Sequence, residues 1–166
     1  MGGQMLSRLR LICLLALLTL PLGAQSYIST HTVSAELLGY PLSGKALHML
    51  KKALRTSETG NHADAIRELQ ETLIKCPGTG AYVYSLLGVE YLKTSQISAA
   101  VNALEQAVTL LPHDASNHAN LGLALVSRGQ YDRAEPELRR ALDLDRRNTV
   151  ASQLLSALAL GKNPQN

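Results

Sequence analysis

Phenylalanine and tryptophan are absent from this chain of 166 residues, and only two cysteines occur in it. Leucine and alanine supply most of the apolar content, which favours helices over β-sheets. One cysteine, Cys13, lies in an apolar N-terminal stretch, so a chain that loses this stretch keeps only Cys76. We therefore expect a helical chain without an internal disulfide.

The motifs of common catalytic sites are also missing. The chain has no glycine-rich phosphate loop, no Gly-x-Ser-x-Gly, no His-Glu-x-x-His and no Cys-x-x-Cys. The five histidines are scattered along the sequence, and no carboxylate pair stands apart from basic neighbours. The sequence therefore predicts no enzymatic activity, no cofactor and no metal site.

The N-terminal stretch has the layout of a secretory signal peptide. Arg8 and Arg10 precede an apolar run at 11–20, and Ala24 or Ser26 offers a small residue for cleavage. The run is shorter than the roughly 20 apolar residues that span a bilayer. We expect export to a periplasm or out of the cell, with no membrane attachment after cleavage; an uncleaved N-terminal membrane anchor is the alternative.

Removal of residues 1–24 would lower the formal charge from +3 to +1, since this stretch carries two arginines and no acid. The basic balance of the full chain is therefore partly a property of the signal. It does not indicate a nucleic-acid partner. Later arginines, at 128–147, alternate with aspartates and glutamates, which is typical of a solvated helix face; binding of an anionic partner is the alternative.

Three segments of similar pattern make up most of the remaining chain. They cover residues 46–79, 81–114 and 115–148, with a spacing of 35 residues and then 34. Ala53, Gly88 and Gly122 fall in register, and each segment reads as two helices joined by a short turn. A glycine inside a helix costs about 1 kcal/mol relative to alanine. We interpret the small residues as points where two helices approach closely.

The pattern resembles the tetratricopeptide repeat (TPR), whose consensus has an aromatic residue, Leu-Gly, Tyr, Ala, Phe and a closing Pro. The matching positions of the second segment are Tyr84, Leu87-Gly88, Tyr91, Ala100, Leu104 and Pro112. Those of the third are His118, Leu121-Gly122, Leu125, Ala134 and Leu138, and those of the first are Met49, Lys52-Ala53, Thr56, Ala65, Leu69 and Pro77. The resemblance implies an all-α, right-handed α-solenoid of three helix-turn-helix repeats.

The flanking segments complete the predicted organisation. Residues 149–160 form an amphipathic helix behind the N-cap Asn148, and this helix would cap the last repeat. Residues 25–45 carry turn residues without a period and are predicted to be a linker, and 161–166 form a tail. Pro136 is expected within or just past the first turn of its helix, where a proline costs little.

His113, Asp114 and His118 lie close together in sequence and are of metal-binding types. The repeat register predicts a different role for each of them. His113 falls in a turn, Asp114 is the N-cap of the next helix, and His118 takes the packing position of Tyr84. We therefore expect turn, cap and core rather than a metal site.

The resemblance also implies a binding face, because the first helix of each TPR pair lines a concave groove that holds peptides. The groove residues carried over to this chain are Leu50, Leu54, Tyr82, Ser85, Val89, Lys93, Asn120 and Leu123, beside Leu47, Lys51, Leu86, Ser116, Ala119 and Ser127. Chaperone-binding TPR domains hold a peptide carboxylate with Lys, Asn and Arg. The matching positions here are Leu50, Leu54, Leu86, Ser116 and Asn120, so only Asn120 is suited to holding peptide backbone.

We therefore predict a protein-interaction module that binds a peptide or an amphipathic helix of another protein in an apolar groove. Several alternatives stay open. The groove leucines could pack against residues 25–45 or the capping helix, the chain could assemble with copies of itself, or it could be an accessory subunit that recruits an enzyme.

Overall fold

The computed structural model describes residues 42–162, and all regular elements within this range are helical. The predicted signal peptide, most of the predicted linker and the last four residues lie outside the described range. The helices are α3 (Gly44–Glu58), α4 (His62–Lys75), the short 3-10 helix η2 (Pro77–Thr79), α5 (Gly80–Lys93), α6 (Ile97–Leu110), α7 (Ala115–Ser127), α8 (Tyr131–Leu144) and α9 (Thr149–Lys162).

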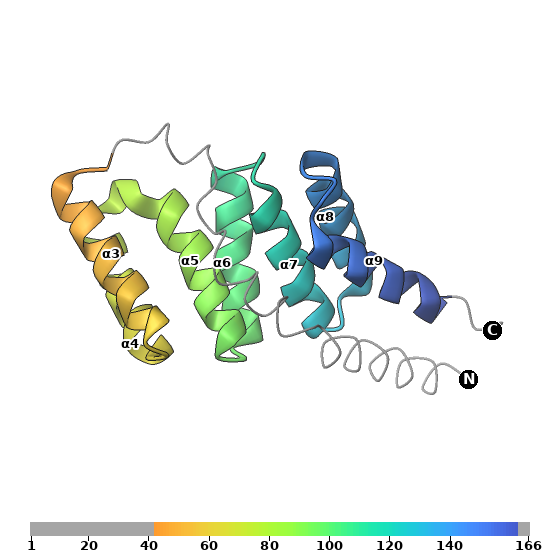
Figure 1. Cartoon of the computed structure of the whole chain (residues 1–166), viewed down its shortest axis with the longest axis horizontal. Helices are drawn as coiled ribbons and strands as arrows, with labels where there is room; N and C mark the ends of the chain where they lie inside the picture. The colour runs from red at the N-terminus through yellow and green to blue at the C-terminus, as the bar shows by residue number, and fades with distance from the viewer. Residues whose placement is uncertain (1–41, 163–166) are drawn as a thin grey trace.

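Figure 1 shows these helices stacked side by side in chain order as an α-solenoid. Helices α3 and α4, α5 and α6, and α7 and α8 form the three predicted pairs, and α9 packs on the last pair. Successive first helices α5, α7 and α9 also contact one another, and these contacts exceed those between successive second helices. The first helices after α3 therefore lie closer together, as expected for the inner layer of a curved array.

The turn inside each pair has the same backbone geometry. Gly60, Ser95 and Gly129, which the sequence places in register, have φ values of 83°, 57° and 79°. In each case the residue that follows donates its N–H to a carbonyl five residues back: Asn61 to Thr56, Gln96 to Tyr91, and Gln130 to Leu125. This bond is typical of the left-handed helix end that glycine favours. Ser95 shows that the turn forms even where a side chain makes it more costly.

Side-chain caps begin several of the helices as the sequence predicts. Asp114 accepts a hydrogen bond from the backbone N–H of Asn117, and Asn148 accepts one from Ala151, both at 2.9 Å. Two boundaries differ from the prediction. Ser43 caps α3, so Gly44 and Lys45 belong to this helix rather than to a linker, and α9 continues to Lys162 instead of ending at Leu160.

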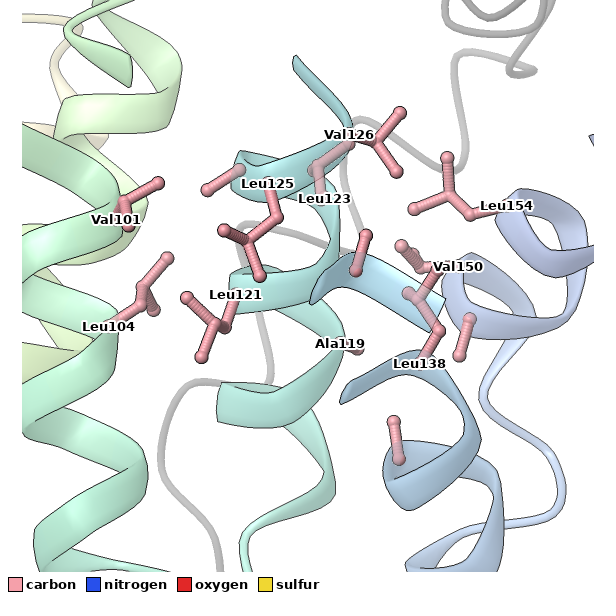
Figure 2. Packing of buried hydrophobic residues seen from close by; sticks show 14 of the residues in the cluster. Val101, Leu104, Ala119, Leu121, Leu123, Leu125, Val126, Leu138, Val150 and Leu154 are labelled. Carbon is pink, nitrogen blue, oxygen red and sulfur yellow. The ribbon is translucent and has the colours of Figure 1, made fainter. Parts of the chain in front are cut away.

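Buried apolar side chains gather in two main clusters. The larger one joins α6, α7, α8 and α9 through residues such as Leu104, Leu125, Leu138 and Leu154, and Figure 2 shows these side chains pointing toward one another. The other joins α3, α4 and α5 with Ala103 of α6. Pro136 lies on α8 as its sixth residue, just past the first turn, and is exposed.

The glycines in the first helices mark the closest helix–helix approach. A Cβ atom built on Gly122 would lie 2.4 Å from Cδ2 and 2.6 Å from Cγ of Leu138, and one on Gly88 would lie 2.5 Å from the same two atoms of Leu104. Real Cβ atoms are essentially never found so near a neighbour. Leu104 and Leu138 are both fully buried and have little freedom to move away.

We expect Gly122→Ala to lower the free energy of unfolding by about 1–3 kcal/mol, because overpacking outweighs the roughly 1 kcal/mol that alanine adds in helix propensity. Chemical denaturation of the two proteins measures the difference. Gly44→Ala is the matched control, since no atom lies within 4 Å of its added Cβ. A Gly122→Ala protein as stable as the control would contradict the close approach.

Candidate peptide-binding face

We use the term first-helix face for the side of α3, α5 and α7 on which the predicted groove residues lie. Five of these residues are buried: the exposed fractions are 4% for Leu50, 1% for Ser85, 3% for Val89, 7% for Asn120 and 4% for Leu123. Leu54, Tyr82 and Lys93 are half-buried. The face therefore has a buried floor, and a partner could reach only part of the predicted set without displacing other atoms. Its binding role stays a prediction.

The structure divides the predicted residues between the two apolar clusters. Leu50 belongs to the cluster of α3, α4 and α5, and the half-buried Leu54 and Tyr82 pack against that cluster. Leu123 belongs to the other cluster, which also holds Leu154 of α9. The capping helix thus shares a core with one predicted groove residue, as the alternative of an internally packed groove proposed for some of them.

The accessible part of the first-helix face lies on α3 and at the start of α5. Leu47 is 42% exposed and stands one helical turn before Leu50, and Lys51 is exposed beside it. Together with the half-buried Leu54 and Tyr82, these residues offer an apolar edge with a cation. No pocket is needed for such an edge to contact an amphipathic segment.

A buried carboxylate, Glu90, ties this edge together. Its exposed fraction is only 4%. It accepts hydrogen bonds from the Ser57 hydroxyl at 2.7 Å, from Nδ1 of His62 at 2.8 Å and from Nζ of Lys93 at 2.9 Å. Burial alone would raise the pKa of Glu90, but the bonds from Lys93, Ser57 and His62 together lower it. Lys93, predicted as a groove residue, is therefore bound to Glu90.

Sequence reasoning did not single out Glu90, although its register contained a signal. The corresponding positions of the other repeats hold Arg55 and Ala124, so no shared residue type marks the site. The signal was a charged residue at a position that packs between two repeats. Its partners Ser57 and His62 lie 33 and 28 residues earlier in the chain.

His118 does more than fill a packing position. It is 9% exposed, and its ring nitrogens face two acceptors: Nδ1 lies 2.7 Å from Oε2 of Glu137, and Nε2 lies 3.0 Å from the carbonyl oxygen of Pro112. Both nitrogens must carry a proton to donate to both acceptors, which favours the imidazolium. Burial lowers the pKa of His118, but the bonds to Glu137 and Pro112 outweigh this effect and raise it, against a smaller opposing influence of Arg140.

The protonated ring joins the end of the second repeat to α8 and should make stability depend on pH. A raised pKa means that the contribution of His118 is complete below its unfolded value, near 6.5, and is lost as the pH rises through the folded value. We expect His118→Ala to lower the free energy of unfolding by about 1.5–3 kcal/mol at pH 6, and by less at pH 9.

Denaturation at several pH values measures the difference between the two proteins, in which the effects of the shared histidines cancel. Nearby Arg140 contacts His113 and does not titrate in this range, whereas Glu137 stays ionised above pH 6. A difference that is constant from pH 6 to pH 9 would show that His118 is not held as an imidazolium.

The junction of the second and third repeats contains polar side chains where the preceding junction is apolar. Ser85, Asn117 and Asn120 take the register positions of Leu50, Val83 and Leu86. Asn117, which the sequence analysis missed, is 3% exposed, and its Nδ2 has no hydrogen-bond partner in the described part of the chain. A buried polar group without a partner costs about 1–3 kcal/mol. The repeat alignment was the signal that could have revealed this set.

Between residues 42 and 162, no three histidine, cysteine, aspartate or glutamate side chains are placed so that they could hold a metal ion. His113 and His118 contact Arg140, Glu137 and Pro112 instead. In the same range no helix has the length and apolar character needed to cross a membrane.

Comparison with known proteins decides the family. The sequence model of the tetratricopeptide repeat family matches residues 85–149. The chain is a tetratricopeptide repeat protein. Solved TPR structures have the same fold: a crystal structure of MamA superposes with a TM-score of 0.66 at 26% identity, over 70% of this chain and 68% of that one.

Other TPR domains show the same architecture at lower identity. The first TPR domain of Spaghetti (RPAP3), bound to the HSP90 peptide SRMEEVD, has a TM-score of 0.68 at 19% identity, over 74% of this chain and 97% of that domain. This level of identity shows the fold alone.

Two curated relatives are much longer than this TPR protein. Heat shock protein STI1 of Saccharomyces cerevisiae is 28% identical over 109 residues, which are 66% of this chain and 15% of the relative. A protein O-mannosyl-transferase of Caenorhabditis elegans is 36% identical over 76 residues, 46% of this chain and 11% of the relative. The chain therefore spans only a small part of either protein. The activities in their names cannot be transferred with the repeats.

Proposed function

We propose that this TPR protein is a non-enzymatic interaction module whose first-helix face binds a peptide or an amphipathic helix of another protein. The observation that carries the proposal is the accessible apolar edge formed by Leu47, Leu54 and Tyr82 above the buried Leu50 and Leu86. An edge of this kind on a preformed helical layer suits the apolar side of a partner segment. Support comes also from related TPR domains, which are named as bound to peptides of HSP90 and HSP70.

The chemistry of this edge differs from that of a carboxylate-binding clamp. At the positions where such clamps hold an acidic C-terminus, this chain has Leu50, Leu54 and Leu86, and Lys93 is already paired with Glu90. A buried apolar surface does not compensate the desolvation of a carboxylate. The partner we propose is therefore apolar on its contact side and is not recognised by a free carboxyl end.

Titration calorimetry with two kinds of peptide tests this proposal. The peptide SRMEEVD, which the Spaghetti domain binds, should show no heat of binding to this chain. Peptides selected from a randomised phage library on the immobilised chain should be apolar. Their affinity should fall at least about tenfold in Leu47→Glu/Leu54→Glu, since burying one large apolar side chain contributes about 1.5–3 kcal/mol.

Ile74→Glu provides the matched control. Ile74 is 79% exposed on α4, in the second-helix layer, so it adds the same charge away from the first-helix face. Binding of SRMEEVD, or equal loss of binding in the control, would contradict the proposal. Light scattering over a concentration series distinguishes self-assembly, because a monomer at every concentration would eliminate that alternative.

We propose further that the chain is exported through residues 1–24. The support is the charge and apolar pattern of that segment. Mass spectrometry of the chain recovered from the secreted or periplasmic fraction should show an N-terminus after Ala24 or Ser26. Recovery of the uncleaved chain from the membrane fraction would support the N-terminal anchor instead.

A further inference from the structure

The polar residues between α5 and α7 form a distinct place on the floor of the first-helix face. Ser85, Asn117 and Asn120 correspond to Leu50, Val83 and Leu86, which share one buried cluster at the preceding junction. Helices α5 and α7 contact each other directly. The repeat symmetry therefore brings Ser85 of α5 together with the two asparagines of α7.

These three residues have hydrogen-bonding capacity that the described chain does not use. The Ser85 hydroxyl donates to the carbonyl of Ala81 at 3.0 Å, so its oxygen remains free to accept. Nδ2 of Asn117 has no partner, and no hydrogen bond joins the side-chain amide of Asn120 to another described residue. Donors and acceptors thus lie side by side in surroundings that are more than nine-tenths buried.

The chemistry of the set indicates a neutral ligand. A buried carboxylate or ammonium group would need an opposite charge, and the charged pair of the same helix, Glu90 and Lys93, is already bonded to itself. A carboxamide carries one acceptor and two N–H donors, which match unpaired donors and acceptors at one time. Because Asn117 is only 3% exposed, the tip of a side chain can approach it more closely than a main chain can.

We propose that the partner segment places the carboxamide of an asparagine or glutamine side chain against Ser85, Asn117 and Asn120. This inference rests on the proposed function and names the chemistry of the partner at one position. Apolar contacts along the first-helix face are non-directional, so an apolar segment could slide over it. One polar contact within an apolar interface fixes a single alignment, as a buried asparagine does in coiled coils.

The phage selection described above also tests this inference. Peptides selected on the unchanged chain should carry Asn or Gln at one position with a fixed spacing to their apolar residues. Replacing that residue by leucine should weaken binding at least about tenfold to the unchanged chain. It should have little effect on binding to Asn117→Val/Asn120→Leu, which restores the residue types of the preceding junction.

A stability measurement keeps the test independent of any peptide. Asn117→Val/Asn120→Leu should unfold at a higher denaturant concentration than the unchanged chain, because the free protein leaves the amides unsatisfied. Asn102→Leu, an exposed position on α6, is the control and should leave both the Asn or Gln preference and the affinity unchanged. A double variant that is less stable would mean that the amides are already satisfied, which overturns the inference.

The remaining outcomes separate this inference from the proposed function. Selected peptides that need Leu47 and Leu54 but show no preferred Asn or Gln would overturn the carboxamide site and leave the proposed function intact. The same holds for a preference that persists in Asn117→Val/Asn120→Leu. Failure to select any peptide that depends on Leu47 and Leu54 would overturn both.

Discussion

The contact between a glycine of one helix and a leucine of the next determines the spacing of the whole array. At Gly88 and Gly122 there is no room for a Cβ, because Leu104 and Leu138 occupy that space. This close approach defines the geometry of a pair, and repetition of the pair brings α5, α7 and α9 into one layer. The first repeat has Ala53 at this position, and its helices contact each other less extensively than those of the later pairs.

The fold could be predicted from the sequence because its determinants are local. Asp114 and Asn148 cap helices three residues away, and the left-handed turns at Gly60 and Gly129 depend on the residue itself. The same alignment assigned Ser95 to a left-handed turn without a glycine. Only helix ends such as Lys162 differed, since capping and packing there compete over one or two residues.

The candidate site could be predicted only in part, because its polar contacts join residues far apart in sequence. The alignment identifies Leu50, Leu54 and Tyr82 as face residues. It cannot show that Lys93 is held by Glu90, or that His118 reaches Glu137, 19 residues later. Burial was also beyond the sequence: Val89 and Leu123 have the right register for a groove, but 3% and 4% of their surfaces are exposed.

The two apolar clusters do not follow the boundaries of the repeats. Helix α5 packs with α3 and α4, whereas Ala100, Val101 and Leu104 of its partner α6 belong to the cluster of α7, α8 and α9. Tyr91 packs against both clusters. The unit that duplicates in sequence is therefore not the unit that is stable on its own. A fragment cut after Pro112 would expose the side of α6 that α7 covers, so repeats of this chain cannot be exchanged as independent modules.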